Sequence, residues 1–139
     1  MKKLHEISIG FFGTANFSLC FLRDLFEHGV KIQFVVSQPP KHSGRGKKLK
    51  PSAVHEWAEQ KNLKVFTPNE ASDKIFMEKI SKNKIDLNII VSYGKILNEK
   101  LLTLPNFFSI NVHASLLPRW RGAAPIHRAI LSNDKKTGV

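Results

Sequence analysis

The chain has 139 residues, enough for one domain with a real core, and its 42% hydrophobic and 24% charged residues argue against intrinsic disorder. The net charge of +11 suggests a polyanionic partner without identifying one. Because no apolar run approaches the roughly 20 residues of a membrane span and the single Cys20 cannot form an internal disulfide, we expect a cytoplasmic protein with no membrane association and a buried, inert thiol.

The first predicted elements form a β–α–β unit. Residues 7–12 are almost continuously apolar and precede a glycine, which is typical of a strand buried on both faces. A helical pattern comes next, with Thr14 or Asn16 as candidate caps and His28 near its end, and residues 30–37 indicate a second buried strand. The intervening turn lacks the G-x-G-x-x-G pattern, so we expect no dinucleotide pyrophosphate site.

Residues 38–50, QPPKHSGRGKKLK, form a loop of unusual composition. It contains two prolines, two glycines and five cationic side chains, namely Lys41, Arg45, Lys47, Lys48 and Lys50. This composition predicts mobility, and a flexible cationic loop beside an α/β cleft can clamp phosphates. The alternative is a solvated surface loop, which the charge alone does not exclude.

The middle of the chain continues the alternation of helices and strands. An amphipathic helix is predicted to open at Pro51 and Ser52 and to run through Gln60, with Val54, Trp57 and Ala58 facing inward. After it come a short strand at 63–66, a helical pattern at 69–82, a buried strand at 86–92 and a short apolar helix around 96–104. Five apolar runs, near residues 7, 31, 63, 87 and 108, therefore predict an α/β domain that is doubly wound around a mainly parallel sheet.

The stretch 109–130 carries the strongest chemical signal. Ile110 and Val112 alternate with Asn111 and His113, so the two polar side chains share one face of a strand. We expect this strand to lie inside a parallel sheet, whose carboxyl end is where α/β folds bind ligands. The amide can stabilise an oxyanion and the imidazole can move a proton. Taken alone, the pair is more simply explained as satisfied polar groups at a strand end.

The end of this strand and the loop after it, together with two other segments, resemble a known family. NVHASLLPRWRGAAPI at 111–126 resembles the signature of the formyltransferases that use 10-formyltetrahydrofolate, in the version of those acting on methionyl-tRNA. The segments Q-P-x-x-x-x-GRGKKL and VSYGKIL resemble the same family, whereas Ala15 and Asn16 depart from its usual GTPDF turn. The helix that closes the stretch has Pro125 in its first turn, where proline is tolerated.

The resemblance implies roles for particular residues. It makes Asn111 and His113 catalytic, with a cis bond expected between the Leu and Pro of the following loop. It assigns the site of the 10-formyltetrahydrofolate formyl donor to six residues: Ser115, Leu116, Leu117, Pro118, Tyr93 and Gly94. Tyr93 could equally be a packed core aromatic. For tRNA binding it implies Arg45, Lys47, Lys48 and Lys41. No metal site is expected, because no His, Cys, Asp or Glu group has ligand spacing.

The resemblance also implies what the chain is. Residues 1–139 correspond to the N-terminal part of a Rossmann-like formyltransferase catalytic domain, without the family's third catalytic residue, an aspartate, and without its C-terminal tRNA-binding domain. We therefore expect formyl transfer to the amino group of methionyl-initiator tRNA, crippled by truncation, and an exposed apolar sheet edge. The family implies a monomer. The alternatives are a non-catalytic folate- or RNA-binding remnant and a formyltransferase for another amine, such as a sugar nucleotide.

Overall fold

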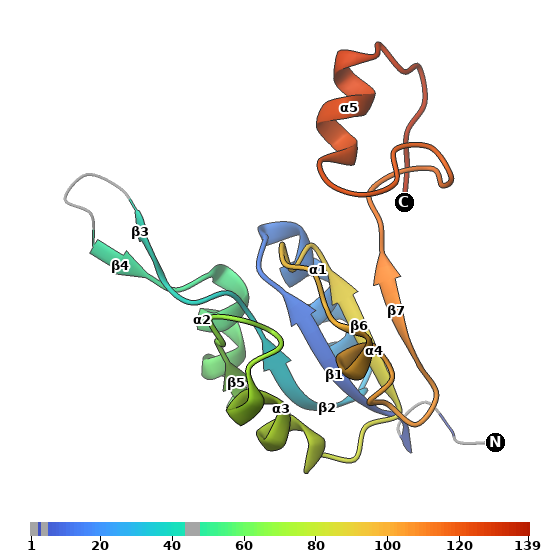
Figure 1. The fold of residues 1–139 in the computed structure, drawn as a ribbon. Helices are drawn as coiled ribbons and strands as arrows, with labels where there is room; N and C mark the ends of the chain where they lie inside the picture. Colours follow the sequence, from blue (N-terminus) through green and yellow to red (C-terminus); the bar gives the residue numbers. More distant parts are fainter. Residues whose placement is uncertain (1–2, 4–5, 44–47) are drawn as a thin grey trace.

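The computed structural model describes residue 3 and residues 6–43 and 48–139. Its main sheet is parallel and has the order β5-β2-β1-β6-β7 (Figure 1). These strands are β1 (Ser8–Gly13), β2 (Lys31–Val36), β5 (Val65–Phe66), β6 (Leu87–Val91) and β7 (Phe108–Val112). The connecting helices are α1 (Asn16–Glu27), α2 (Ala53–Gln60), α3 (Lys74–Ser81), α4 (Glu99–Leu102) and α5 (Pro125–Leu131). The predicted α/β fold with a mainly parallel sheet is confirmed.

Apolar side chains cover both faces of this sheet. On one face, Leu22 of α1 and Val54 of α2 belong to one buried cluster with strand residues of β1, β2 and β6. On the other face, Phe76 of α3 and Leu101 of α4 belong to a second cluster. The strand order reverses between β1 and β6, which makes their carboxyl ends the place where doubly wound folds bind ligands.

The helix ends show why several predicted boundaries hold. Ser52 caps α2 by accepting a hydrogen bond from the His55 amide at 3.1 Å, and the three residues predicted to face inward from α2 are buried. The expectation that Thr14 or Asn16 caps α1 was wrong, because the cap position is Ala15, which offers no side-chain acceptor. Cys20 was also expected to be buried and is instead exposed, since α1 buries the face that carries Leu22.

Strand β7 lies at the edge of the sheet. It pairs with β6 in register from Phe108 to Val112, and no strand among the described residues pairs with its other side. Our expectation that the Ile110 strand lies between two neighbours was therefore wrong. The apolar edge that we also expected is present, because Phe108 is 57% exposed and Ile110 is 42% exposed.

The cationic segment after β2 contains a hairpin where the sequence pattern predicted an irregular loop. Its strands are β3 (Lys41–Ser43) and β4 (Lys48–Lys50), which pair antiparallel with Lys41 opposite Lys50. Arg45 and Lys47 lie outside the described residues. The hairpin extends beyond the carboxyl end of β2, on the opposite flank of the sheet from α5 (Figure 1). Among the described helices, none is long and apolar enough to cross a membrane.

Candidate active site

A cavity of about 770 Å³ lies at the carboxyl ends of β6 and β7, within the size range of small-molecule sites. Its wall comes from the turn after β6, from the end of β7 and from the residues that begin α5. Four of the predicted site residues border this cavity: Tyr93, Gly94, Asn111 and His113. The other predicted folate residues, 115–118, do not line it.

The wall after β6 is made by a tight left-handed turn. Gly94 has a φ of +81°, and a Cβ there would lie 2.5 Å from Nε2 of Gln38. That amide donates to the Tyr93 carbonyl at 2.9 Å, and the Thr14 hydroxyl donates to the same oxygen at 3.0 Å. These two donors hold the turn against the β1 and β2 ends, and its positive φ favours glycine at position 94.

Tyr93 serves mainly as a core residue. It is 1% exposed, and its ring meets the Phe12 ring edge-to-face at a centroid distance of 5.7 Å. Burial, with the Glu70 charge as a smaller cause, raises the pKa of Tyr93 to about 12. Of the two interpretations left open for this side chain, the packed aromatic is the one observed, and the residue borders the cavity from there.

The wall from β7 carries the polar pair. Asn111 lies opposite Ile90 of β6 and is exposed, while His113 follows the last residue of the strand. Nδ1 of His113 lies 2.8 Å from the Ser115 hydroxyl, and Nε2 lies 3.1 Å from the Gly122 carbonyl. The predicted geometry, with an amide and an imidazole at one strand end, is therefore present.

The partners of His113 limit where its protons can lie. Ser115 donates its one hydroxyl proton to the Arg119 carbonyl at 2.8 Å, so its oxygen is an acceptor toward Nδ1 of His113. The Gly122 carbonyl can only accept from Nε2. Both contacts are hydrogen bonds when both ring nitrogens carry a proton. In that form the imidazole is a cation at the cavity wall.

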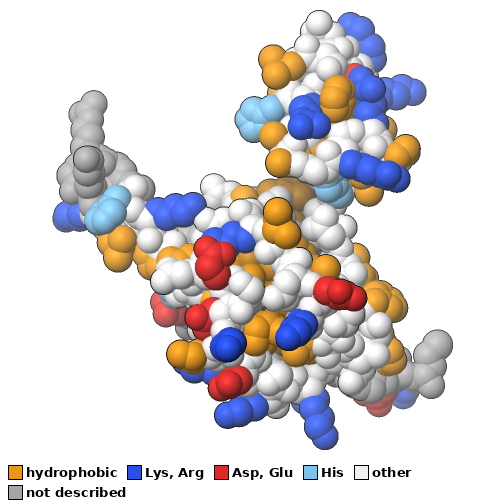
Figure 2. All heavy atoms as spheres, in the orientation of Figure 1, with side chains coloured by type: hydrophobic (Ala, Val, Ile, Leu, Met, Phe, Trp, Pro, Cys, Tyr) orange, Lys and Arg blue, Asp and Glu red, His pale blue; other side chains and the backbone are white. Residues whose placement is uncertain are grey.

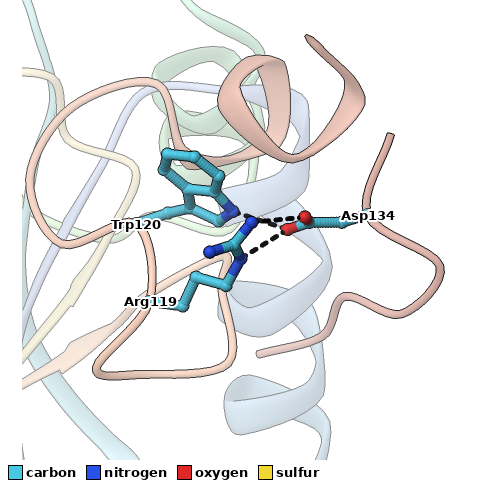
Figure 3. Close-up of polar contacts among 3 residues, drawn as sticks. All are labelled: Arg119, Trp120 and Asp134. Atoms are coloured by element: carbon cyan, nitrogen blue, oxygen red, sulfur yellow. Dashed lines mark hydrogen bonds and ion pairs between the residues drawn. The ribbon is translucent and has the colours of Figure 1, made fainter. Parts of the chain in front are cut away.

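A charged cluster that sequence reasoning missed lies behind this loop. The Asp134 carboxylate accepts from Arg119 at 2.8 and 2.6 Å and from the Trp120 indole at 2.6 Å (Figure 3). The hydrogen bond from Arg119 and then that from Trp120 lower the pKa of Asp134 to about 2. The Arg119 guanidinium also lies 4.3 Å from the centroid of the Trp120 ring. We call Arg119, Trp120 and Asp134 the clamp.

The remaining predicted residues that the structure describes do not line the cavity. Leu116 and Leu117 are 50% and 57% exposed, and the bond between Leu117 and Pro118 is cis, as expected. Lys41 and Lys48 are exposed on the β3–β4 hairpin. Sequence reasoning assigned Ser115 to folate, whereas its hydroxyl is committed to His113 and Arg119.

Among the described residues, basic side chains border the cavity without acidic ones beside them. Lys95, His113 and His127 border it, and no Asp or Glu of the described chain does. The Lys95 ammonium is bonded to the Asn69 carbonyl. Among residue 3, residues 6–43 and residues 48–139, no group of three or more His, Cys, Asp or Glu side chains could hold a metal ion.

Comparisons with known proteins point to one family. Residues 10–139 match the formyl transferase family. A methionyl-tRNA formyltransferase of Phenylobacterium zucineum is 44% identical over 131 residues, which are 94% of this chain and 42% of that protein. One of Symbiobacterium thermophilum is 47% identical over 133 residues, which are 96% of this chain and 41% of that protein. The chain thus spans less than half the length of these curated relatives.

Solved structures share the fold at lower identity. A glycinamide ribonucleotide transformylase from Geobacillus kaustophilus superposes with a TM-score of 0.71 at 18% identity, over 94% of this chain and 70% of that one. A formyltetrahydrofolate deformylase from Pseudomonas syringae gives 0.65 at 18% identity, over 91% of this chain and 42% of that one. At this identity the likeness concerns the architecture alone.

Proposed function

The chain belongs to the formyl transferase family, and on this premise we propose that it is the N-terminal part of a catalytic domain that formylates methionyl-initiator tRNA. The proposed formyl donor is 10-formyltetrahydrofolate. The names of the relatives at 44% and 47% identity support the tRNA substrate. The match to the formyl transferase family supports a folate-derived formyl donor.

The observation that carries the proposal is the placement of Asn111 and His113 on one cavity wall, at the carboxyl end of a parallel sheet. In the proposed reaction the methionyl amine attacks the formyl carbon, and the formyl oxygen becomes an oxyanion. The Asn111 amide donates a hydrogen bond to this oxyanion, and the positive charge of the doubly protonated His113 stabilises it. The bond from carbon to the folate nitrogen then breaks, that nitrogen takes up a proton, and the amine has lost one.

The substrates engage different parts of the surface in this proposal. The exposed side chains of Leu116 and Leu117 offer apolar contact to the folate ring system. In the sequence, Pro118 separates these two residues from Arg119 of the clamp. The cationic segment binds tRNA phosphates through Lys41, Arg45, Lys47 and Lys48. Of these, Lys41 and Lys48 are exposed on paired strands, which supports a phosphate-facing ribbon.

The test is formylation of methionyl-tRNA with 10-formyltetrahydrofolate by the chain, by Asn111→Ala and by His113→Ala. Removing one oxyanion donor is expected to lower kcat roughly 100- to 1,000-fold. His28→Ala is the matched control, because His28 is an exposed histidine at the C-cap of α1. Turnover that survives both cavity substitutions would contradict the proposal. Activity on an amino sugar nucleotide, with none on methionyl-tRNA, would favour the alternative substrate.

A further inference from the structure

A continuous polar path joins His113 to the clamp. It runs from Nδ1 of His113 to the Ser115 hydroxyl at 2.8 Å, and from that hydroxyl to the Arg119 carbonyl at 2.8 Å. The side chain of Arg119 is then held by the Asp134 carboxylate at two points (Figure 3). Arg119 therefore accepts the Ser115 proton through its carbonyl and is anchored by Asp134 through its side chain.

The backbone beside Arg119 requires such an anchor. Trp120 has a φ of +58°, in the left-handed region that residues with a Cβ rarely adopt. Ala124 has a φ of +55°, so the loop is strained on both sides of Gly122, whose carbonyl faces Nε2 of His113. Strained backbone persists only where its surroundings fix it. The Trp120 ring is fixed on its edge by Asp134 and on its face by Arg119.

We propose that Arg119 and Asp134 are positioning residues for His113, acting through the Ser115 hydroxyl. The clamp holds the Arg119 carbonyl where it takes the proton of Ser115. Ser115 Oγ is then left as an acceptor, so Nδ1 of His113 must carry a proton. The inference rests on the proposed function in one respect, because the proton so fixed belongs to the imidazole that would stabilise the oxyanion.

The burial and charge of these groups fit a built network. Ser115 is 2% exposed, so water does not compete for its hydroxyl. The Asp134 side chain is 13% exposed and that of Arg119 is 56% exposed. Because the pKa of Asp134 is lowered to about 2, the carboxylate remains charged under ordinary conditions. The charge of the clamp therefore stays the same over the pH range in which His113 would act.

The test reads the imidazole of His113 directly, by proton–nitrogen NMR of the folded chain, with the signal assigned from His113→Ala. In the unaltered chain we expect a protonated Nδ1. Ser115→Ala and Asp134→Asn should each shift the ring toward the form protonated only at Nε2. We expect exchange of the Nδ1 proton to speed up roughly two- to tenfold, the range for one lost hydrogen bond. Asp24→Asn on α1, which neutralises an exposed carboxylate that lies beside a histidine, is the matched control.

A double-variant comparison separates positioning from mere loss of structure. If the clamp acts through Ser115, Asp134→Asn adds nothing to Ser115→Ala, and Asp134→Glu restores part of the effect. Additive effects, or an Asp134→Asn spectrum in which His113 is unchanged, would overturn the proposal. These readouts need no turnover, so the formylation assay bears on the proposed function alone, and this inference stands or falls on the spectra.

Discussion

The sheet and the lobe of residues 113–139 are held together by different forces. The sheet buries complete aromatic and aliphatic side chains on both faces, with Phe11, Phe12 and Phe34 at 0% exposure. Helix α5, by contrast, buries only Ala129, and its Ile130 and Leu131 are 69% and 82% exposed. Figure 2 shows apolar and cationic side chains mixed over the lobe that contains α5. The lobe is held in place instead by the clamp and by the hydrogen bonds of His113 with Ser115 and Gly122.

The largest expected effect tests the apolar side of this comparison. Phe34 meets Phe12 and Phe66 edge-to-face at 6.1 and 5.9 Å, so Phe34→Ala should cost about 3–5 kcal/mol of unfolding free energy. Ile130→Ala, at an exposed site, should change it by no more than about 0.5 kcal/mol. Urea unfolding measures both. Similar costs for the two variants would mean that the lobe has an apolar core of its own.

The sheet is also the region that the sequence predicts best. Continuous apolar runs report strands buried on both faces, and the spacing of Val54, Trp57 and Ala58 reports which face of α2 is inward. The position of β7 at the edge was not predictable in this way. The strand around Ile110 contains apolar residues, as a buried strand does. Whether it has a second neighbour, however, depends on other segments of the chain.

The candidate site was predictable only in part, for a similar reason. Asn111 and His113 could be placed together because period-2 geometry relates residues two apart. Asp134 could not, since its partner Arg119 is fifteen residues away in irregular backbone, where no period links the two. The hydrogen bond from the Ser115 hydroxyl to Arg119 was also not predicted. Its acceptor is a main-chain carbonyl, which every residue carries, so the sequence does not mark it.

A smaller effect shows whether local polar contacts also matter in the sheet region. Ser52→Ala removes the acceptor of the His55 amide and should cost about 1 kcal/mol. Helix α1 has Ala15 at the equivalent position without a side-chain bond, so Ala15→Ser should stabilise by up to about 1 kcal/mol. Urea unfolding again measures both. An unchanged stability in the two variants would mean that water caps these helices equally well.

The smallest expected effect is local and concerns the polar side of the comparison. The pKa of Asp134 is lowered from 3.8 to about 2, so the folded state favours the carboxylate. The stability that the clamp contributes is thus complete above about pH 4 and is lost as the pH falls through 2. The indole N–H signal of Trp120, which donates to this carboxylate at 2.6 Å, reports the change by NMR.

We expect the Trp120 signal to stay constant from pH 7 to about 4 and to move with a midpoint near 2, the lowered pKa of Asp134 in the folded chain. Trp57, 9% exposed in the sheet region, serves as the internal control for the global fold. Asp134→Asn should abolish the movement, and Arg119→Ala should raise its midpoint toward 3.8, because the guanidinium is the main cause of the lowered pKa. A midpoint near 3.8 in the unaltered chain would mean that the clamp is open in solution. The lobe would then have neither apolar burial nor a fixed carboxylate to order it.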